Sequence, residues 1–236
     1  MQLKLQSMIK HIFFDLDHTI WDFDRNAQET LMELYEIYKL KELGLTSAEN
    51  FITTYTINNH QLWAQYHVGK ITKEALREER FRKTFIDLGL HPELIPANFE
   101  ADYVAMGPTK TNLFEGAEKV LAYLQNKYHL HIISNGFKEA VVTKMTVSNL
   151  NPYFKNVVIS EDVGVNKPDK AIFEHALNLA KAQKQESIMI GDSLEADIYG
   201  AQNFGMRAIF FNPLKADKPD EVKEQIHHLE ELLNYF

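Results

Sequence analysis

Two aspartates, Asp15 and Asp17, stand directly after a short apolar run, Ile12-Phe13-Phe14, near the start of this 236-residue chain. A carboxylate can attack phosphorus and form a covalent aspartyl-phosphate, which divides one difficult step into two easier ones. A second carboxylic acid beside it can protonate the leaving oxygen and later accept a proton from water. Because side chains at i and i+2 share one face of an extended strand, Asp17 can reach the pocket that Asp15 faces. The pair therefore predicts a nucleophile, Asp15, and an acid/base, Asp17.

Three further motifs follow, each at or just after an apolar segment: Ser134 and Asn135 in Ser-Asn-Gly, Lys167 in Asn-Lys-Pro-Asp, and Asp192 with Asp197 in Gly-Asp-Ser-Leu-Glu-Ala-Asp. The hydroxyl and the backbone N–H groups after it would bind phosphate oxygens, and the lysine would hold the phosphate as a point charge. Mg²⁺ takes one or two carboxylates plus the substrate phosphate and stabilises the transferred charge, and Asp15 and Asp192 fit that count. Together the motifs indicate magnesium-assisted phosphoryl transfer.

Each motif alone has a simpler structural interpretation. An Asp-x-Asp pair is commonly a solvated loop, and Ser-Asn-Gly is typical of a turn. Lys-Pro-Asp is typical of a helix start, with Pro168 at its first position, and Gly-Asp-Ser of a capped strand-to-helix turn. These interpretations do not explain why all four motifs occur in order, each after its own apolar segment. We therefore favour the catalytic interpretation.

The four motifs together resemble those of the haloacid dehalogenase superfamily of phosphohydrolases, and the resemblance covers the whole chain. Two longer segments, Phe-Phe-Asp-Leu-Asp-His-Thr and Val-Gly-Val-Asn-Lys-Pro-Asp, are similar to the corresponding motifs of the YjjG-like pyrimidine nucleoside monophosphatases. The resemblance implies that Asp15 is the nucleophile, that Asp17 is the acid/base and lends its backbone carbonyl to Mg²⁺, and that Asp192 binds the metal directly. It further implies that Asp197 holds a metal-bound water or orients Lys167. His18 departs from the pattern, because many relatives carry glycine there.

The composition sets broad limits. The chain has 45% hydrophobic residues, which is enough for a sizeable core, and no cysteine, which excludes disulfides, thiolate zinc sites and cysteine-dependent phosphatases. The net charge of −8 argues against a nucleic-acid polymer as partner. The N-terminus lacks the apolar core of a signal peptide, and no apolar run approaches the roughly 18 residues of a membrane span. We expect a cytoplasmic enzyme, a monomer or homodimer, with no membrane partner.

The order of elements predicts an α/β fold. A strand within residues 9–20 is expected to end in the aspartates, and from about residue 110 helices alternate with strands. This alternation predicts a Rossmann-like parallel sheet with helices on both faces. Ligands of such sheets bind beyond the carboxyl ends of the strands, where the four motifs lie. We expect a catalytic core formed by residues 1–21 and 110–236.

Residues 22–109 are predicted to form an inserted, all-helical cap domain. A cap of this kind excludes water from the site and contacts the leaving group. Trp63 and Tyr66, near the end of its second helix, are candidate substrate contacts, and packing inside the cap is the alternative. Four basic residues of the following helix are interpreted as a solvated face: Arg77, Arg80, Arg82 and Lys83.

The leading function is that of a Mg²⁺-dependent 5'-nucleotidase whose partner is a small phosphate monoester, namely a pyrimidine nucleoside monophosphate. A phosphatase of another small metabolite, such as a sugar phosphate or phosphoglycolate, stays open, as does a sugar phosphomutase with the same aspartyl-phosphate chemistry. A non-hydrolytic phosphoacceptor is disfavoured by the acid/base Asp17 and by the large cap.

Overall fold

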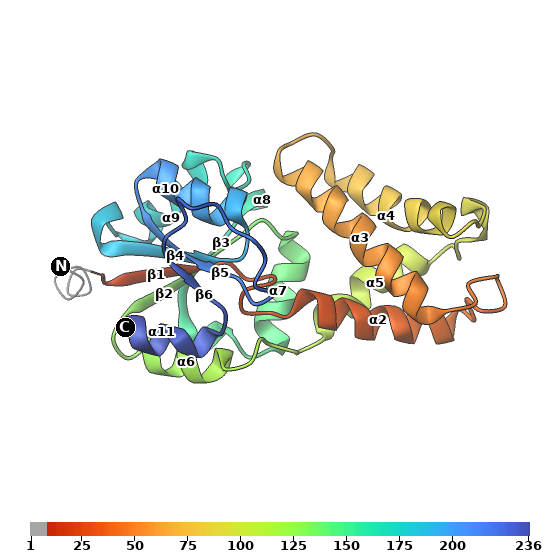
Figure 1. The fold of residues 1–236 in the computed structure, drawn as a ribbon, viewed down its shortest axis with the longest axis horizontal. Coiled ribbons are helices and arrows are strands. Elements are labelled where there is room, and N and C mark those ends of the chain that lie inside the picture. The colour runs from red at the N-terminus through yellow and green to blue at the C-terminus, as the bar shows by residue number, and fades with distance from the viewer. Residues whose placement is uncertain (1–8) are drawn as a thin grey trace. The chain divides into compact units, whose positions relative to one another are not determined.

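The computed structural model describes residues 9–236, which divide into two compact units (Figure 1). The segment that ends at Asp22 forms one unit together with Thr111–Phe236, and Phe23–Lys110 forms the other. Each boundary falls one residue after the position that the sequence predicts. The first unit is α/β and the second is helical, in agreement with the predicted fold class.

The first unit contains a six-stranded sheet in the order β3-β2-β1-β4-β5-β6, and every neighbouring pair is parallel. The strands of the central four positions are rich in Ile and Phe and are buried almost throughout, as expected for a parallel sheet covered on both faces. The strand bounds are β1 (His11–Phe14), β2 (His129–Ser134), β3 (Phe154–Ile159), β4 (Ser187–Gly191), β5 (Arg207–Phe211) and β6 (Gln225–Ile226).

The predicted first strand is too long. β1 ends at Phe14, and Asp15 and Asp17 lie in the turn after it. The backbone N–H groups of Ile20 and Trp21 donate to the Leu16 carbonyl, at 3.0 and 2.8 Å, so the chain curls back on itself instead of pairing with a neighbouring strand. The short strand β6 was not predicted, because two residues carry no periodic pattern.

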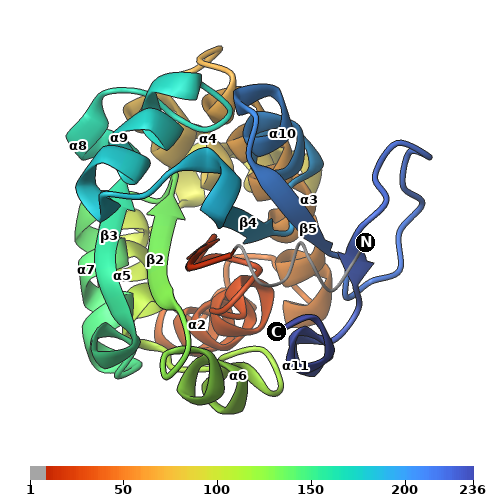
Figure 2. The same cartoon turned by 90° about the vertical axis from the view of Figure 1, so that its left-hand side faces the viewer.

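Helices cover both faces of the sheet. Figures 1 and 2 show α9 and α10 on one face and α6 and α11 on the other. Phe173, Met189 and Ile198 belong to the core that joins α9 to the sheet. The helices of this unit are α6 (Ala117–Leu124), α7 (Lys138–Val147), α8 (Ser160–Val163), α9 (Lys170–Ala180), a π-helix (Leu194–Tyr199), α10 (Gly200–Phe204) and α11 (Leu232–Tyr235).

The second unit is built from four helices, α2 (Phe23–Ile37), α3 (Ala48–His67), α4 (Lys73–Asp87) and α5 (Phe99–Met106). Ser47 caps α3 and Thr72 caps α4, since each hydroxyl accepts a backbone N–H three residues on. The core of this unit is largely aromatic, and its rings include Phe51, Tyr55, Phe81, Phe85, Phe99 and Tyr103.

One basic residue of α4 contradicts the interpretation of a solvated face. Arg80 is only 3% exposed, and its guanidinium donates to both carboxylate oxygens of Glu100, at 2.6 and 3.0 Å. It also lies over the Tyr103 ring, 4.6 Å from the centroid. Arg80 is therefore a paired, buried cation that joins α4 to α5.

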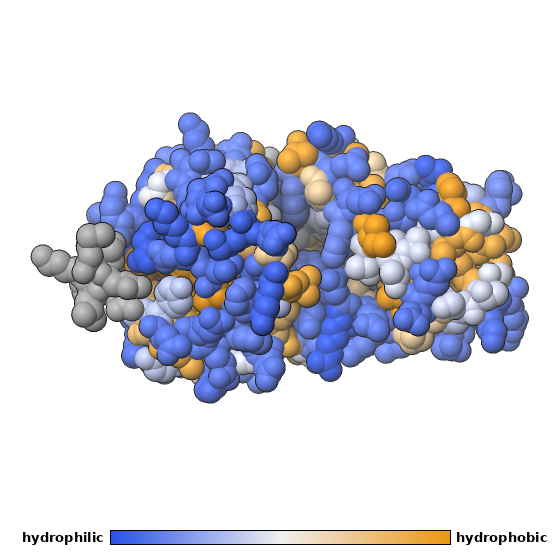
Figure 3. Space-filling model, viewed as in Figure 1, coloured by the Kyte–Doolittle hydropathy of each residue, from blue (hydrophilic) through white to orange (hydrophobic). Residues whose placement is uncertain are grey.

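Hydrophilic residues cover most of the face shown in Figure 3, and the apolar residues on it form small separate groups. Among residues 9–236, no helix combines the length and apolar character that crossing a membrane requires.

Candidate active site

Three of the predicted residues lie where neighbouring strands end. Asp15 follows β1, Ser134 is the last residue of β2, and Asp192 follows β4. Phe14 of β1 is level with Ile132 and Ile190, so the three strands run to the same edge in register. Because parallel strands bring their carboxyl ends together, residues far apart in the sequence meet there.

Lys167 is the centre of this arrangement. Its side chain is 2% exposed, and its Nζ donates to Asp15 Oδ1 at 2.5 Å, to Asp197 Oδ1 at 2.7 Å and to the Ile133 carbonyl at 2.7 Å. Burial by itself would lower the pKa of Lys167, but the two carboxylates outweigh burial and hold that pKa above its usual value. Lys167 is therefore a fixed positive charge beside the candidate nucleophile.

Asn135 holds the backbone that carries this lysine. Its Nδ2 donates to the Lys167 carbonyl at 3.0 Å, and the Lys167 N–H donates to its Oδ1 at 2.8 Å. Ser134, 1% exposed, accepts the Gly136 N–H at 3.0 Å through Oγ. Both residues are predicted to bind phosphate. The side chain of Asn135, in addition, holds the backbone of Lys167 through these two hydrogen bonds.

Asp15, Asp192 and Asp197 offer carboxylate oxygens that all lie within 4.8 Å of one another. Burial raises the pKa of Asp15 well above its usual value, and burial followed by the charge of Asp197 raises the pKa of Asp192 to about 7. Three crowded carboxylates carry more negative charge than the surrounding residues neutralise. A hard divalent cation with oxygen ligands relieves such crowding, so this donor set fits Mg²⁺.

Two contacts orient these carboxylates. Thr19 Oγ1 donates to Asp192 Oδ1 at 3.2 Å, and the Ser193 N–H donates to Asp197 Oδ2 at 3.1 Å. Gly191 leaves the space for this arrangement, because a Cβ there would lie 2.2 Å from Asp197 Oδ2. Contacts of this kind fix the direction of a metal-binding group.

Asp17 has a different partner. Its Oδ1 accepts a hydrogen bond from Lys144 Nζ at 2.6 Å, and the lysine side chain is 5% exposed. The same ammonium lies 4.2 Å from the centroid of the Trp21 ring. The predicted nucleophile and the predicted acid/base are thus each paired with a separate buried lysine.

His18 lies in the turn between these residues with φ of 61°. This left-handed region favours glycine and is costly for a residue with a Cβ. The glycine that the resemblance leads us to expect here would adopt this conformation without that cost, whereas His18 adopts it while its N–H donates to the Trp21 carbonyl at 2.9 Å.

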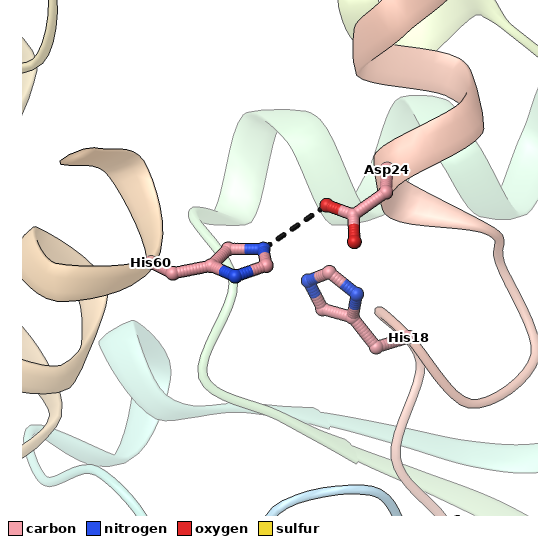
Figure 4. A group of neighbouring side chains, drawn as sticks. All are labelled: His18, Asp24 and His60. Carbon is pink, nitrogen blue, oxygen red and sulfur yellow. Dashed lines mark hydrogen bonds and ion pairs between the residues drawn. The ribbon is translucent and has the colours of Figure 1, made fainter. Parts of the chain in front are cut away.

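The candidate cap residues lie together in the helical unit. Trp63 and Tyr66 are half-buried on α3, with ring centroids 5.4 Å apart in an edge-to-face arrangement, and His67 lies 5.5 Å from Trp63. Earlier on the same helix, His60 Nε2 lies 3.0 Å from Asp24 Oδ1. Figure 4 shows these two side chains pointing toward each other. The α3 end therefore presents a group of partly exposed rings.

Sequence reasoning missed Lys144 and gave no role to Thr19. Lys144 could have been found, since Val141, Lys144 and Met145 recur at the i, i+3, i+4 spacing of an inward helix face. A lysine on such a face is buried and needs an anionic partner. Thr19, fully buried, carried no comparable signal.

Known proteins are similar to this chain in sequence and in fold. The family model of haloacid dehalogenase-like hydrolases matches residues 9–205. The pyrimidine 5'-nucleotidases PynA of Streptococcus pneumoniae and YjjG of Escherichia coli are each 32% identical, over 86% and 94% of this chain and 84% and 96% of their own. A glyceraldehyde 3-phosphate phosphatase of Pyrococcus abyssi is 32% identical over 86% of this chain and 82% of its own. The structure of the putative HAD-hydrolase YfnB from Bacillus subtilis, bound to magnesium, matches with a TM-score of 0.84 and 28% identity, covering 96% of this chain and 97% of that one.

Proposed function

The chain belongs to the haloacid dehalogenase-like hydrolases, and from this premise we propose that it is a Mg²⁺-dependent phosphatase acting on pyrimidine nucleoside 5'-monophosphates. The observation that carries the phosphatase proposal is the Lys167 centre, where one buried ammonium contacts both Asp15 and Asp197. The residues proposed as the nucleophile, the phosphate-binding cation and part of the metal-binding set thus lie in one cluster.

The charge balance supports the metal. The metal-binding set has three carboxylates, those of Asp15, Asp192 and Asp197, and one accompanying ammonium group, that of Lys167, which leaves a formal charge of minus two at this set. One divalent cation held there would balance that charge and would allow a dianionic phosphate to approach a site that otherwise repels it. We propose that Asp15, Asp192 and the Asp17 carbonyl hold it, with Asp197 in support.

In the proposed mechanism Asp15 attacks phosphorus and the bond to the leaving oxygen breaks. Lys167 fixes the Asp15 carboxylate and attracts the phosphate oxygens as a point charge, and the Ser134 hydroxyl donates to one of them. Asp17 gives its proton to the leaving alkoxide and so releases a nucleoside. Asp17 then takes a proton from water, which attacks the phosphorus of the aspartyl-phosphate, and inorganic phosphate leaves with Asp15 restored.

The choice of leaving group rests on separate support. Two relatives named pyrimidine 5'-nucleotidase cover most of the chain. The helical unit Phe23–Lys110 enters the chain directly after the Asp15 turn, and we propose that it serves as a cap that selects the substrate. The half-buried rings of Trp63 and Tyr66 offer a surface for a nucleobase, and such stacking contributes roughly 1–3 kcal/mol per base.

The second candidate is a phosphatase of triose phosphates. The Pyrococcus abyssi relative with that activity in its name is as similar in identity as the nucleotidases. A small substrate of this kind offers no base to stack, so it would make no use of the aromatic group on α3.

A phosphate-release assay with a substrate panel tests the proposal. The panel contains uridine, thymidine, cytidine, adenosine and guanosine monophosphates, glyceraldehyde 3-phosphate, a hexose phosphate, phosphoglycolate and an aryl phosphate, each with Mg²⁺ and with a chelator. We expect Mg²⁺-dependent release with the highest kcat/KM for pyrimidine nucleotides. A triose phosphate that exceeds every nucleotide would overturn the nucleotidase proposal, and release unaffected by chelation would overturn the metal.

Substitution of Trp63 by alanine separates recognition from packing. If the ring stacks on a base, the KM for pyrimidine nucleotides rises while the aryl phosphate is turned over as before. A parallel loss for both substrates, together with a lower melting temperature, would place Trp63 in the core of the helical unit instead.

A further inference from the structure

The contact between Lys144 and Asp17 links two parts of the chain that are 127 residues apart in sequence. Lys144 lies on α7, whose other cation near its start, Lys138, is exposed and pairs with Asp162. Lys144 instead points inward, and its side chain is 5% exposed. Placing an ammonium in such a position is costly unless a specific partner compensates for lost hydration, and that partner is the predicted acid/base.

The geometry divides the two oxygens of Asp17 between two surroundings. Oδ1 accepts the hydrogen bond from Lys144 Nζ at 2.6 Å. Oδ2 faces the Gly136 backbone. A Cβ built on Gly136 would lie 3.2 Å from Asp17 Oδ2 and 3.1 Å from Ser134 Oγ, so both oxygens lie beside this glycine. One oxygen is therefore anchored, and the other is held on the side of the residue proposed to bind phosphate.

The ring of Trp21 holds the Lys144 ammonium in place. Its ring is 2% exposed, and the Lys144 ammonium lies over it at 4.2 Å from the centroid. A cation over an indole face gains electrostatic attraction, most when it is withdrawn from water. A flexible four-carbon side chain is thus held at its charged end by a ring and a carboxylate.

We propose that Lys144 is a positioning residue for the acid/base: it holds Oδ1 of Asp17 so that Oδ2 is directed at the leaving oxygen and, afterwards, at the attacking water. This inference rests on the proposed phosphatase function. Lys144 acts through Asp17 and takes no part in binding the phosphate, which distinguishes it from Lys167.

A double-mutant cycle tests this role. Lys144→Met keeps most of the length of the side chain and removes the charge. We expect it to lower kcat for a pyrimidine nucleotide by at least about tenfold, and by no more than the roughly 10²–10⁴-fold that an acid/base contributes. KM should change little, because Ser134 and Lys167 are intact. In an Asp17→Asn background the same Lys144→Met change should alter kcat by no more than about twofold.

Two further variants define the interpretation. Lys144→Arg keeps a cation that can stack on Trp21 and should retain more activity than Lys144→Met. Lys138→Met, on the same helix, removes an exposed cation and should leave kcat unchanged. The Asp17→Asn/Lys144→Met protein removes both charges of the buried pair, so its comparison with Asp17→Asn stands even where Lys144→Met alone folds poorly.

The outcomes separate the two proposals. A wild-type protein that releases no phosphate from any monoester overturns the proposed function. An active phosphatase in which Lys144→Met lowers kcat equally with and without the Asp17 carboxylate overturns only the positioning role. A Lys144→Arg enzyme no better than Lys144→Met, or a loss that appears in KM alone, also overturns the positioning role.

Discussion

A pair of buried histidines in the sheet makes the stability of this protein sensitive to acid. His131 of β2 is 1% exposed, and its ring stacks on Phe13 with centroids 4.6 Å apart. Its Nε2 lies 3.1 Å from His11 Nδ1, and its Nδ1 lies 2.9 Å from the Asn156 amide nitrogen. Both ring nitrogens are therefore engaged while the ring is neutral, and a proton added to this ring would enter a site without an anionic partner.

The magnitude follows from the pKa. Burial, followed by the neighbouring His11 and His129, lowers the pKa of His131 from 6.5 to about 3. The unfolded chain then binds a proton that the folded chain refuses, so the stability contributed by this group is complete above pH 6.5 and is lost as the pH falls toward 3. Between pH 8 and pH 4.5 the free energy of unfolding falls by about 3 kcal/mol. Only the roughly two pH units below the unfolded-state pKa of 6.5 contribute, and each contributes about 1.4 kcal/mol.

Urea unfolding at a series of pH values, with wild type and His131→Gln side by side, measures this loss. Glutamine keeps hydrogen-bonding groups near His11 and Asn156 but does not titrate. The raised pKa values of Asp15 and Asp192 act in the opposite direction in both proteins and cancel in the difference. We expect His131→Gln to lose about 3 kcal/mol less than wild type between pH 8 and 4.5. The exposed His175→Gln serves as control, and identical pH slopes for wild type and His131→Gln would refute the reasoning.

The remaining predictions concern the carboxylates. Asp17→Asn should slow nucleotide turnover by roughly 10²–10⁴-fold and an aryl phosphate less, because a good leaving group needs little protonation; equal losses in steady-state assays would argue against an acid role. Asp197→Ala should raise the Mg²⁺ concentration needed for half-maximal activity by about 10–100-fold, and Asp192→Ala should raise it further. The opposite order in a Mg²⁺ titration would contradict the proposed ligand set. Gly191→Ala should destabilise the fold by about 1–3 kcal/mol in thermal unfolding, because its Cβ would lie 2.2 Å from Asp197 Oδ2, and an unchanged melting temperature would show that the space is not needed.

Much of the fold could be predicted because the signals are local. Runs such as Ile188-Met189-Ile190 predicted buried parallel strands, and a polar residue at the end of each run indicated the edge where a ligand would bind. The length of β1 could not be predicted, since the turn that stops it depends on several N–H groups donating to the single carbonyl of Leu16.

Contacts between distant segments were beyond local reasoning. The sequence shows Lys144 on an inward helix face but not that Asp17 lies opposite it. Arg80 was misinterpreted for the same reason, because its partner Glu100 lies 20 residues further on and the two meet only when α4 packs on α5. A helical pattern can thus indicate that a charge is buried, but the partner that compensates it is identified only when the packing is known.

The central claim is that phosphate passes through a covalent bond to Asp15. Rapid acid quench of the enzyme during turnover of a labelled pyrimidine nucleotide with Mg²⁺, followed by peptide mass spectrometry, tests it directly. We predict a phosphorylated Asp15 in wild type and more of it in Asp17→Asn with an aryl phosphate, because the attacking water then lacks its base. Asp15→Asn should give none. Phosphate found on Asp17 or on another side chain, or full turnover by a folded Asp15→Asn protein, would contradict it.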